Sequence, residues 1–334
     1  MPWPRKRRRR VFLARCDQTA LNPESPVPQI SVVIPTRNRH RVLSDAIGSV
    51  LSQSFADIEL IVVDDFSEDA TPDLLAGISD PRFRWARFDR WRHGGAARNH
   101  GVAMARAPVI AFLDSDDVYL EHRLRDDWRF LADHPEVDVR LSSYEDVTES
   151  GSVAAVNPEA VFDHDELERY LVAYCLYLGG SGITIRRAAF DAVGGFDETV
   201  LRMQDREFLL RVSRSRGAAV TSDVNWVKRR SPDSISHQPS GQLRALAEMC
   251  RRHPVIREEY ADIYRYLVAR EILAPLVKGR LGVALATLRE ARANDLEVAV
   301  GRLASDYIVG KRRRQEIRAQ MVQRFPGPPR EALS

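Results

Sequence analysis

The stretch Ala111-Phe112-Leu113-Asp114-Ser115-Asp116-Asp117-Val118-Tyr119 decides the fold, because an apolar run that begins at Val109 ends here in three carboxylates within four positions. Packed carboxylates repel one another unless a cation or hydrogen-bond donors hold them. In an α/β sheet, ligands collect at the carboxyl ends of the strands. Hard oxygen ligands suit Mg²⁺ or Mn²⁺, and these ions usually bind together with a phosphate. The stretch therefore predicts a metal-diphosphate site at Asp114 and Asp116, with a solvated acidic turn that caps the next helix as the alternative.

The residues before this stretch alternate between strand and helix patterns. Residues 30–34 and 58–63 are rich in β-branched side chains and predict buried strands, and residues 83–87 predict a third. Between the first two strands, apolar positions recur at helical spacing from Val42 to Leu51. Because strands and helices in alternation form βαβ units, the sequence predicts an α/β fold with a mostly parallel, Rossmann-like sheet flanked by helices.

The second half of the chain is less regular. Residues 137–147 predict a strand, residues 148–164 a loop and residues 165–178 a helix. From residue 241 the pattern is almost wholly helical and amphipathic. We therefore expect three parts, which are a basic, proline-containing tail and linker over 1–29, a compact domain over 30–240 and an all-helical extension over 241–334.

Composition excludes several classes of protein. The chain has 334 residues and a formal net charge of +3, so its overall charge does not point to nucleic acid as a partner. Its three cysteines are widely separated, which fits neither a disulfide framework nor a zinc site and favours a reducing compartment. No apolar run predicts a transmembrane helix, and the one after the basic N-terminus is too short for a secretory signal. We therefore expect a cytoplasmic protein.

The basic run Arg5-Lys6-Arg7-Arg8-Arg9-Arg10 has two interpretations. One is a solvated tail without a partner. The other is electrostatic contact with an anionic membrane, which would hold the protein peripherally on the inner face of that membrane. The sequence leaves both open.

A loop of small residues, His93-Gly94-Gly95-Ala96-Ala97-Arg98-Asn99-His100-Gly101, opens another predicted helix. Glycine lets a backbone approach a ligand closely, and a helix N-terminus favours anions. The GxGxxG fingerprint is absent, which argues against a nicotinamide-dependent enzyme. The loop therefore favours an anion other than a nicotinamide dinucleotide.

Six segments stand in an order that is typical of one enzyme family, and they are Ser31-Val32-Val33-Ile34-Pro35-Thr36-Arg37-Asn38-Arg39, the run from Val62 to Thr71, the run from Gly94 to Gly101, Asp114-Ser115-Asp116-Asp117, Val193-Gly194-Gly195-Phe196-Asp197-Glu198, and Gln204-Asp205. With these segments, residues of about 30–240 resemble the catalytic domain of a family 2 glycosyltransferase with the GT-A fold. The resemblance implies inverting transfer of a sugar from a UDP- or dTDP-linked donor to the hydroxyl of a carbohydrate or lipid-linked acceptor. The setting it implies is the synthesis of cell-surface polysaccharide or glycolipid.

The resemblance assigns donor binding to residues at the ends of the predicted strands. Asp65 would accept the imide N–H of a uracil or thymine, although it could equally cap the next helix. Asp116 would ligate Mn²⁺ or Mg²⁺ directly, and Asp114 would meet the ribose and the water shell of the metal, since one or two carboxylates are enough for Mg²⁺. The other implied nucleotide-sugar-binding residues are Pro35, Thr36, Arg37, Asn38, Arg98 and Ser115.

On the acceptor side, the resemblance makes Asp205 the candidate general base, with a helix cap as the alternative role. The family often has Glu directly before the base, where this chain has the uncharged Gln204. Gly180 and Ser181 would shape the acceptor side, although the same glycine-rich run also fits a simple tight turn.

The segment that begins at Arg229 resembles a family loop that commonly has His where Ser231 stands. Ser231 is a poorer metal ligand, so His237 could substitute for it or could be a solvated loop residue. The cations from Lys228 to Arg230 could neutralise a diphosphate from the same loop.

Two other functions remain open on the sequence alone. A nucleotidyltransferase also joins a parallel sheet to an acidic metal site, but it would need a glycine-rich basic loop directly after the first strand, and residues 36–39 contain no glycine. The second alternative is a non-catalytic nucleotide-sugar-binding protein. The presence of Asp65, Asp114, Asp116 and Asp205 together argues against it.

Overall fold

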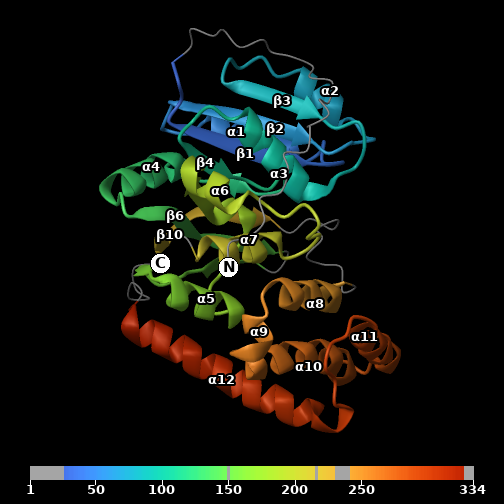
Figure 1. Ribbon diagram of the computed structural model, residues 1–334. Helices are drawn as coiled ribbons and strands as arrows, with labels where there is room; N and C mark the ends of the chain where they lie inside the picture. The colour runs from blue at the N-terminus through green and yellow to red at the C-terminus, as the bar shows by residue number, and fades with distance from the viewer. Residues whose placement is uncertain (1–25, 149–150, 215–216, 230–240, 327–334) are drawn as a thin grey trace.

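A computed structural model describes residues 26–148, 151–214, 217–229 and 241–326 (Figure 1). The strands are β1 Ile30–Thr36, β2 Ile58–Asp64, β3 Phe83–Arg87, β4 Val109–Phe112, β5 Val118–Tyr119, β6 Val137–Thr148, β7 Gly151–Ala155, β8 Ala160–Phe162, β9 Ile183–Arg186 and β10 Gly217–Arg229. The helices are α1 Leu43–Leu51, α2 Thr71–Ala76, α3 His93–Met104, α4 Arg123–Asp133, α5 His164–Val172, α6 Arg187–Val193, α7 Gln204–Val212, α8 Gln242–Arg252, α9 Val255–Glu258, α10 Ala261–Val277, α11 Leu281–Ala293 and α12 Leu303–Arg324. The N-terminal basic run, Ser231 and His237 lie outside the described residues.

One sheet organises the molecule, with the strand order β3-β2-β1-β4-β9-β6-β10-β5. The pairs β3–β2, β2–β1 and β1–β4 are parallel, as the βαβ pattern predicts. β9 is antiparallel to both of its neighbours, β4 and β6, so β6 has the direction of β4, and β10 is parallel to β6. The long strands thus share one direction, while β5, β7, β8 and β9 oppose it.

The two faces of the sheet bury separate cores. Ile30, Val32 and Ile34 of β1 point into a core with α1 and α4, whereas Val33 points into a core with α3, α6 and α7. This division follows from the period of two along a strand. Since both faces are covered, β1 is buried along nearly its whole length.

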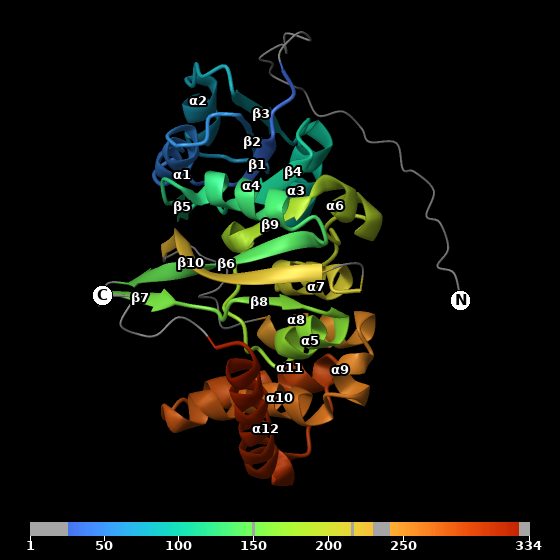
Figure 2. The ribbon, with the colours of Figure 1, turned by 90° about the vertical axis from the view of Figure 1, so that its left-hand side faces the viewer.

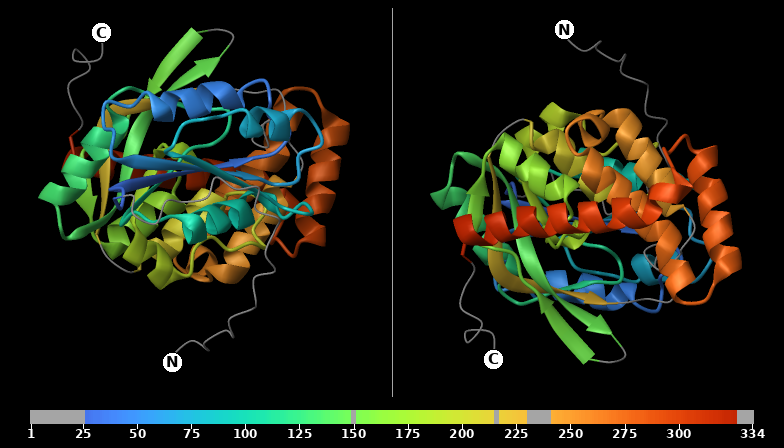
Figure 3. Two further views of the ribbon diagram at one scale, coloured as in Figure 1. Left: turned by 90° about the horizontal axis from the view of Figure 1, so that it is seen from above. Right: turned by 90° about the horizontal axis from the view of Figure 1, so that it is seen from below.

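The prediction of a loop over residues 148–164 is wrong, because β7 and β8 lie within it. β7 pairs with the end of β6, and this hairpin protrudes from the body of the molecule (Figure 3). β8 pairs with β10 through Ala160, Val161 and Phe162. Both strands are short, and most of β7 is exposed, so they carry too few buried apolar residues to give a strand pattern in the sequence.

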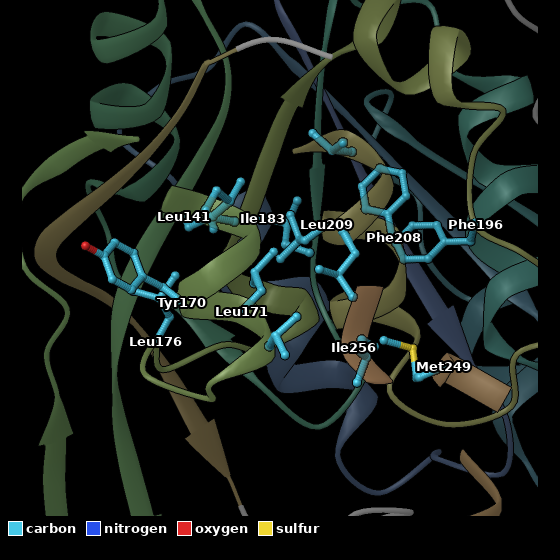
Figure 4. Close-up of a cluster of buried hydrophobic side chains, with 14 of the residues drawn as sticks. Leu141, Tyr170, Leu171, Leu176, Ile183, Phe196, Phe208, Leu209, Met249 and Ile256 are labelled. Carbon is cyan, nitrogen blue, oxygen red and sulfur yellow. The ribbon is translucent and has the colours of Figure 1, made fainter. Parts of the chain in front are cut away.

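The helices after residue 241 form a layer below the sheet, with α12 running along its far side (Figures 1 and 2). One hydrophobic core continues from the sheet through α7 into this layer, where Phe208 and Leu209 lie near Met249 and Ile256 (Figure 4). Gly310 of α12 faces the backbone of α10 so closely that a Cβ atom would collide with the carbonyl of Asp262. Whether the helical layer is a separate domain, as predicted, stays a prediction. Within the described part of the chain, no helix is both long and apolar enough to cross a membrane.

Candidate active site

Three strands end side by side at one edge of the sheet. Thr36 ends β1 opposite Asp64 of β2, and the backbone N–H of Asp65 donates to the carbonyl of Thr36 over 2.8 Å. Leu113, which follows β4, donates to the carbonyl of Val33. Because these neighbours are parallel, their carboxyl ends bring the polar residues that follow them to a common edge.

Arg98 of α3 is the centre of a compact polar cluster, which we call the Arg98 cluster and which also contains Asp114, Gly180 and Gln204. Nη2 of Arg98 lies 2.5 Å from Oδ1 of Asp114, and Nη1 donates to Oε1 of Gln204 over 2.8 Å. Burial lowers the pKa of Arg98, but the carboxylates of Asp114 and Asp205 outweigh it, so the pKa is raised. A Cβ atom on Gly180 would lie 3.1 Å from Oδ1 of Asp114, so a side chain at that position would crowd the ion pair.

The acidic turn, residues 114–117, is held by a serine. Ser181 is fully buried, accepts a hydrogen bond from the backbone N–H of Asp114 over 3.0 Å, and donates to Oδ2 of Asp117 over 2.5 Å. Asp117 also accepts from the backbone N–H of Arg229. Burial and the charge of Asp114 raise the pKa of Asp117 well above its usual value. The hydroxyl of Ser181 is thus used inside the protein, and Asp117 joins the turn to the end of β10.

Asp116 is the member of the turn with the weakest contacts. Its Oδ2 lies 3.7 Å from Nη2 of Arg39, and the side chain keeps 17% of its exposure. Burial and the charge of Asp114 raise the pKa of Asp116, against the charges of Arg39 and Lys228. Ser115 between the two carboxylates is itself buried.

The described residues contain no cluster of three or more His, Cys, Asp or Glu side chains that could hold a metal ion. Mg²⁺ and its analogues nevertheless bind through one or two carboxylates when phosphate oxygens complete the shell. Asp116 and Asp114 fit this smaller requirement, because each stays partly exposed and a divalent cation would relieve their mutual repulsion. The donor set therefore suits a metal that arrives with a diphosphate.

Asp65 holds the start of α3. Its Oδ1 accepts from the backbone N–H of Arg92 over 2.7 Å. Burial raises its pKa, against backbone hydrogen bonds from Arg92 and His93 and the charge of Arg37. Asp65 does not cap the next helix, α2, which has no side-chain cap. It binds the backbone just before α3 instead, and its neighbour Asp64 accepts from the backbone N–H of Ser67.

An exposed aromatic residue beside Asp65 has no counterpart in the sequence prediction. Trp91 is 53% exposed, with the guanidinium of Arg37 4.3 Å from the centre of one ring and the His93 ring 4.1 Å away. The signal that could have found it was a tryptophan between two arginines just before the glycine-rich loop.

The loop after β1 binds mainly to the segment after β2. Asn38 adopts a positive φ of 53°, donates its backbone N–H to Ser67, and accepts from the backbone of Glu68. Pro35 lies within β1. Oγ1 of Thr36 and Nε of Arg37 are buried and have no hydrogen-bond partner within the described ranges.

Asp205 lies in the first turn of α7, whose other face packs Phe208 and Leu209 into the core (Figure 4). Its Oδ1 is buried and has no hydrogen-bond partner among the described residues. Burial raises its pKa, the charge of Arg98 opposes this rise, and the charge of Asp114 adds to it. The first residue of the helix, Gln204, binds Arg98, so Asp205 stands beside the Arg98 cluster. Within the described residues no hydrogen bond or ion pair joins it to Asp65.

Comparison with known proteins identifies the family. Residues 31–194 match the model described as Glycosyl transferase family 2. The succinoglycan biosynthesis protein ExoO of Rhizobium meliloti is 46% identical over 99 residues, which cover 30% of this chain and 28% of that protein. The UDP-Glc:alpha-D-GlcNAc-diphosphoundecaprenol beta-1,3-glucosyltransferase WfgD of Escherichia coli is 36% identical over 95 residues, which cover 28% of this chain and 38% of that protein. The matched part thus spans well under half of either relative.

The fold itself is found in solved structures. The mannosyltransferase PcManGT from Pyrobaculum calidifontis, solved with GDP-Man and Mn²⁺, superposes with a TM-score of 0.55 at 17% identity, over 89% of this chain and 86% of that one. At this identity the likeness shows the fold alone. Through residues 31–194 the chain thus belongs to glycosyl transferase family 2, and the structural likeness shows that it has the GT-A fold.

Proposed function

We propose that the protein transfers a sugar, with inversion, from a UDP- or dTDP-linked donor to an acceptor hydroxyl. The observation that carries this proposal is Oδ1 of Asp205, which is buried without a hydrogen-bond partner in the described structure and stands beside the Arg98 cluster. A carboxylate with a raised pKa and one buried oxygen free of hydrogen bonds is suited to take a proton. The nucleotidyltransferase and the non-catalytic binding protein are the competing functions.

The proposed reaction gives the donor and the acceptor separate sets of residues. Asp65 and the end of β1 would bind the nucleotide, and Arg98 would face the diphosphate together with the acidic turn. The acceptor hydroxyl would enter beside Gly180 and Gln204, lose its proton to Asp205, and attack the anomeric carbon opposite the leaving nucleoside diphosphate. Base catalysis of this kind contributes about 10²–10⁴-fold to the rate.

Mn²⁺ or Mg²⁺ is the proposed cofactor, held by Asp116 with Asp114 nearby. The carboxylates fit it as described above, and PcManGT, which shares the fold, was solved with Mn²⁺. When bound, the ion would neutralise negative charge on the diphosphate.

The proposed acceptor is a carbohydrate or a lipid-linked sugar of a cell-surface polysaccharide or glycolipid. The names of ExoO and WfgD, which refer to succinoglycan and to a diphosphoundecaprenol-linked acceptor, support this class. A cytoplasmic location, with peripheral contact to the membrane through the basic N-terminus, stays a prediction.

Incubation of the protein with a panel of UDP- and dTDP-sugars and Mn²⁺, without acceptor, tests the proposal. We expect slow hydrolysis that releases free nucleoside diphosphate, and little of it when EDTA replaces the metal. Release of pyrophosphate from a sugar phosphate and a nucleoside triphosphate would instead show a nucleotidyltransferase. Saturable binding of a donor without hydrolysis, even when candidate lipid-linked acceptors are added, would show a binding protein.

A further inference from the structure

The helical layer packs directly on α7 through α8 and α9, and α12 also contacts a short loop, residues 173–178, which follows α5 and touches α7. Its second residue, Tyr174, has a positive φ of 53°. This left-handed conformation is uncommon for a residue other than glycine, and it persists where surrounding contacts hold it. The contacts of Tyr174 therefore show what the loop is built to do.

Arg314 of α12 holds the backbone of this loop. Its Nε donates to the carbonyl of Ala173 over 3.0 Å, and its Nη2 donates to the carbonyl of Tyr174 over 2.7 Å. Carbonyls at the end of a helix have no partner within the helix. The planar fork of a guanidinium can bind two of them at once, which a lysine ammonium cannot do with the same geometry.

The side chain of Tyr174 in turn contacts α7 on both sides of Asp205. The guanidinium of Arg206 lies 3.7 Å from the centre of the Tyr174 ring, and the Tyr174 hydroxyl donates to the sulfur of Met203 over 3.4 Å. Met203 precedes α7 with a positive φ of 58°. Arg206 also donates to the carbonyl of Leu171 at the end of α5. Tyr174 thus fixes the residue just after Asp205 and the turn just before it.

We infer that Arg314 is a positioning residue for the general base, acting from α12 through Tyr174 on the residues that flank Asp205. The inference rests on the proposed function of Asp205. It gives the helical layer a role in turnover, because a small displacement of a catalytic group is enough to slow a reaction.

The charged groups that face Asp205 set the sign of the pH effect. They are Arg98 on α3, Asp114 after β4, Lys228 on β10 and Arg206 on α7 itself. The cation of Arg206 lowers the pKa of Asp205, whereas Asp114 raises it. If Arg206 leaves its place over Tyr174, Asp205 keeps its proton to a higher pH, and the acidic limb of the rate profile moves upward.

The test compares Arg314→Lys with Arg318→Lys in the full chain. Arg318 lies one turn further along α12 and donates to the hydroxyl of Tyr177 in the same loop over 2.9 Å, so it is a matched control. For Arg314→Lys we expect kcat for donor hydrolysis to fall about tenfold, with the donor KM unchanged and the acidic limb of the kcat profile at higher pH. Arg318→Lys should match the wild type. Equal kcat values and pH profiles for the two variants would overturn the inference.

A second pair keeps the test decisive if Arg314→Lys does not fold. Tyr174→Phe retains the ring under Arg206, whereas Tyr174→Leu removes it. The acidic limb should move in the leucine variant and stay in place in the phenylalanine variant. If the acidic limb of the kcat profile lies at the same pH in both variants, the inference is contradicted.

Asp205→Asn, measured in parallel, separates the two claims. If this variant retains turnover, Asp205 is not the base and the proposed function fails with the inference. If it loses turnover while the Arg314 and Tyr174 variants keep normal rates and profiles, only the inference fails.

Discussion

Asp114 and Asp205 both lie near Arg98, yet their surroundings differ. Asp114 is paired directly with the guanidinium and sits in a turn that Ser181 and Asp117 hold in place. Oδ1 of Asp205 is buried without a hydrogen bond in the described structure, and burial raises its pKa. Two carboxylates beside one cation can thus serve different purposes, because a carboxylate whose pKa is raised, as in Asp205, exchanges its proton more easily near neutral pH.

Apart from Asp205 itself, the acidic turn should give the largest effect, if its charge serves the leaving group. Asp116→Asn removes the carboxylate with the fewest contacts, and we expect kcat/KM in the presence of Mn²⁺ to fall about 10²–10³-fold, the cost of losing one group that stabilises developing charge. Initial rates across a Mn²⁺ titration measure it. Asp126→Asn on α4, a half-buried carboxylate that pairs with Arg125, is the control. If Asp116→Asn keeps the wild-type rate and metal dependence, the acidic turn has no role in the reaction.

The next effect concerns the cation that the two carboxylates share. Arg98→Lys keeps the charge but loses the fork that binds Asp114 and Gln204 together. We expect kcat/KM to fall about tenfold to a hundredfold, because a hydrogen bond to a charged group is worth about 1.5–3 kcal/mol. The control is Arg106→Lys, since Arg106 pairs with Glu59 at the opposite end of β2. An equal, small effect of both substitutions would show that the Arg98 cluster is structural.

A smaller effect should separate Asp65 from its neighbour Asp64. Asp65→Asn keeps an oxygen for the backbone N–H of Arg92 but presents an amide that is a poorer acceptor for a base imide. We expect the donor KM to rise about tenfold, as for the loss of one charged acceptor, with little change in Tm. Asp64→Asn should leave the donor KM near the wild-type value, because Asp64 is fully buried and pairs with Arg87. Calorimetry and donor titration measure both.

The smallest effect is on stability. The pKa of Asp205 is raised in the folded protein, so the folded state is favoured below the ordinary carboxyl range and loses that advantage as the pH rises through the raised pKa. Asp205→Asn is neutral at every pH and should therefore raise Tm at neutral pH, with a difference that shrinks as the pH is lowered. Melting curves across this range measure it. A lower Tm at neutral pH would show that the carboxylate is paired.

The strand that leads to Asp114 could be predicted from the sequence, whereas the surroundings of Asp205 could not. The β-branched runs at residues 30–34 and 58–63 and the acidic stretch after Leu113 correctly predicted β1, β2 and β4, and the alternation of strands and helices correctly predicted that these strands pair in parallel. Such local signals suffice because buried parallel strands are nearly continuous in apolar residues. The family and the fold were predicted from the same segments and are confirmed.

Contacts between distant residues could not be predicted. Gln204 reaches Arg98 across 106 positions, and Ser181 reaches Asp117 across 64. Neither pairing leaves a periodic pattern, because it depends on how α3, α7 and β9 pack against one another. The role of Arg314 is of the same kind, since an arginine in a basic run on α12 gives no sign in the sequence that it binds carbonyls beside α5.

The most direct test of the central claim is the Asp205→Asn variant, with kcat for donor hydrolysis and donor Kd measured separately. If Asp205 takes the proton, kcat should fall about 10²–10⁴-fold while the donor Kd stays at the wild-type value, and the acidic limb of the kcat profile should disappear. A kcat near that of the wild type, or a loss of activity that follows entirely from lost donor binding, would contradict the account.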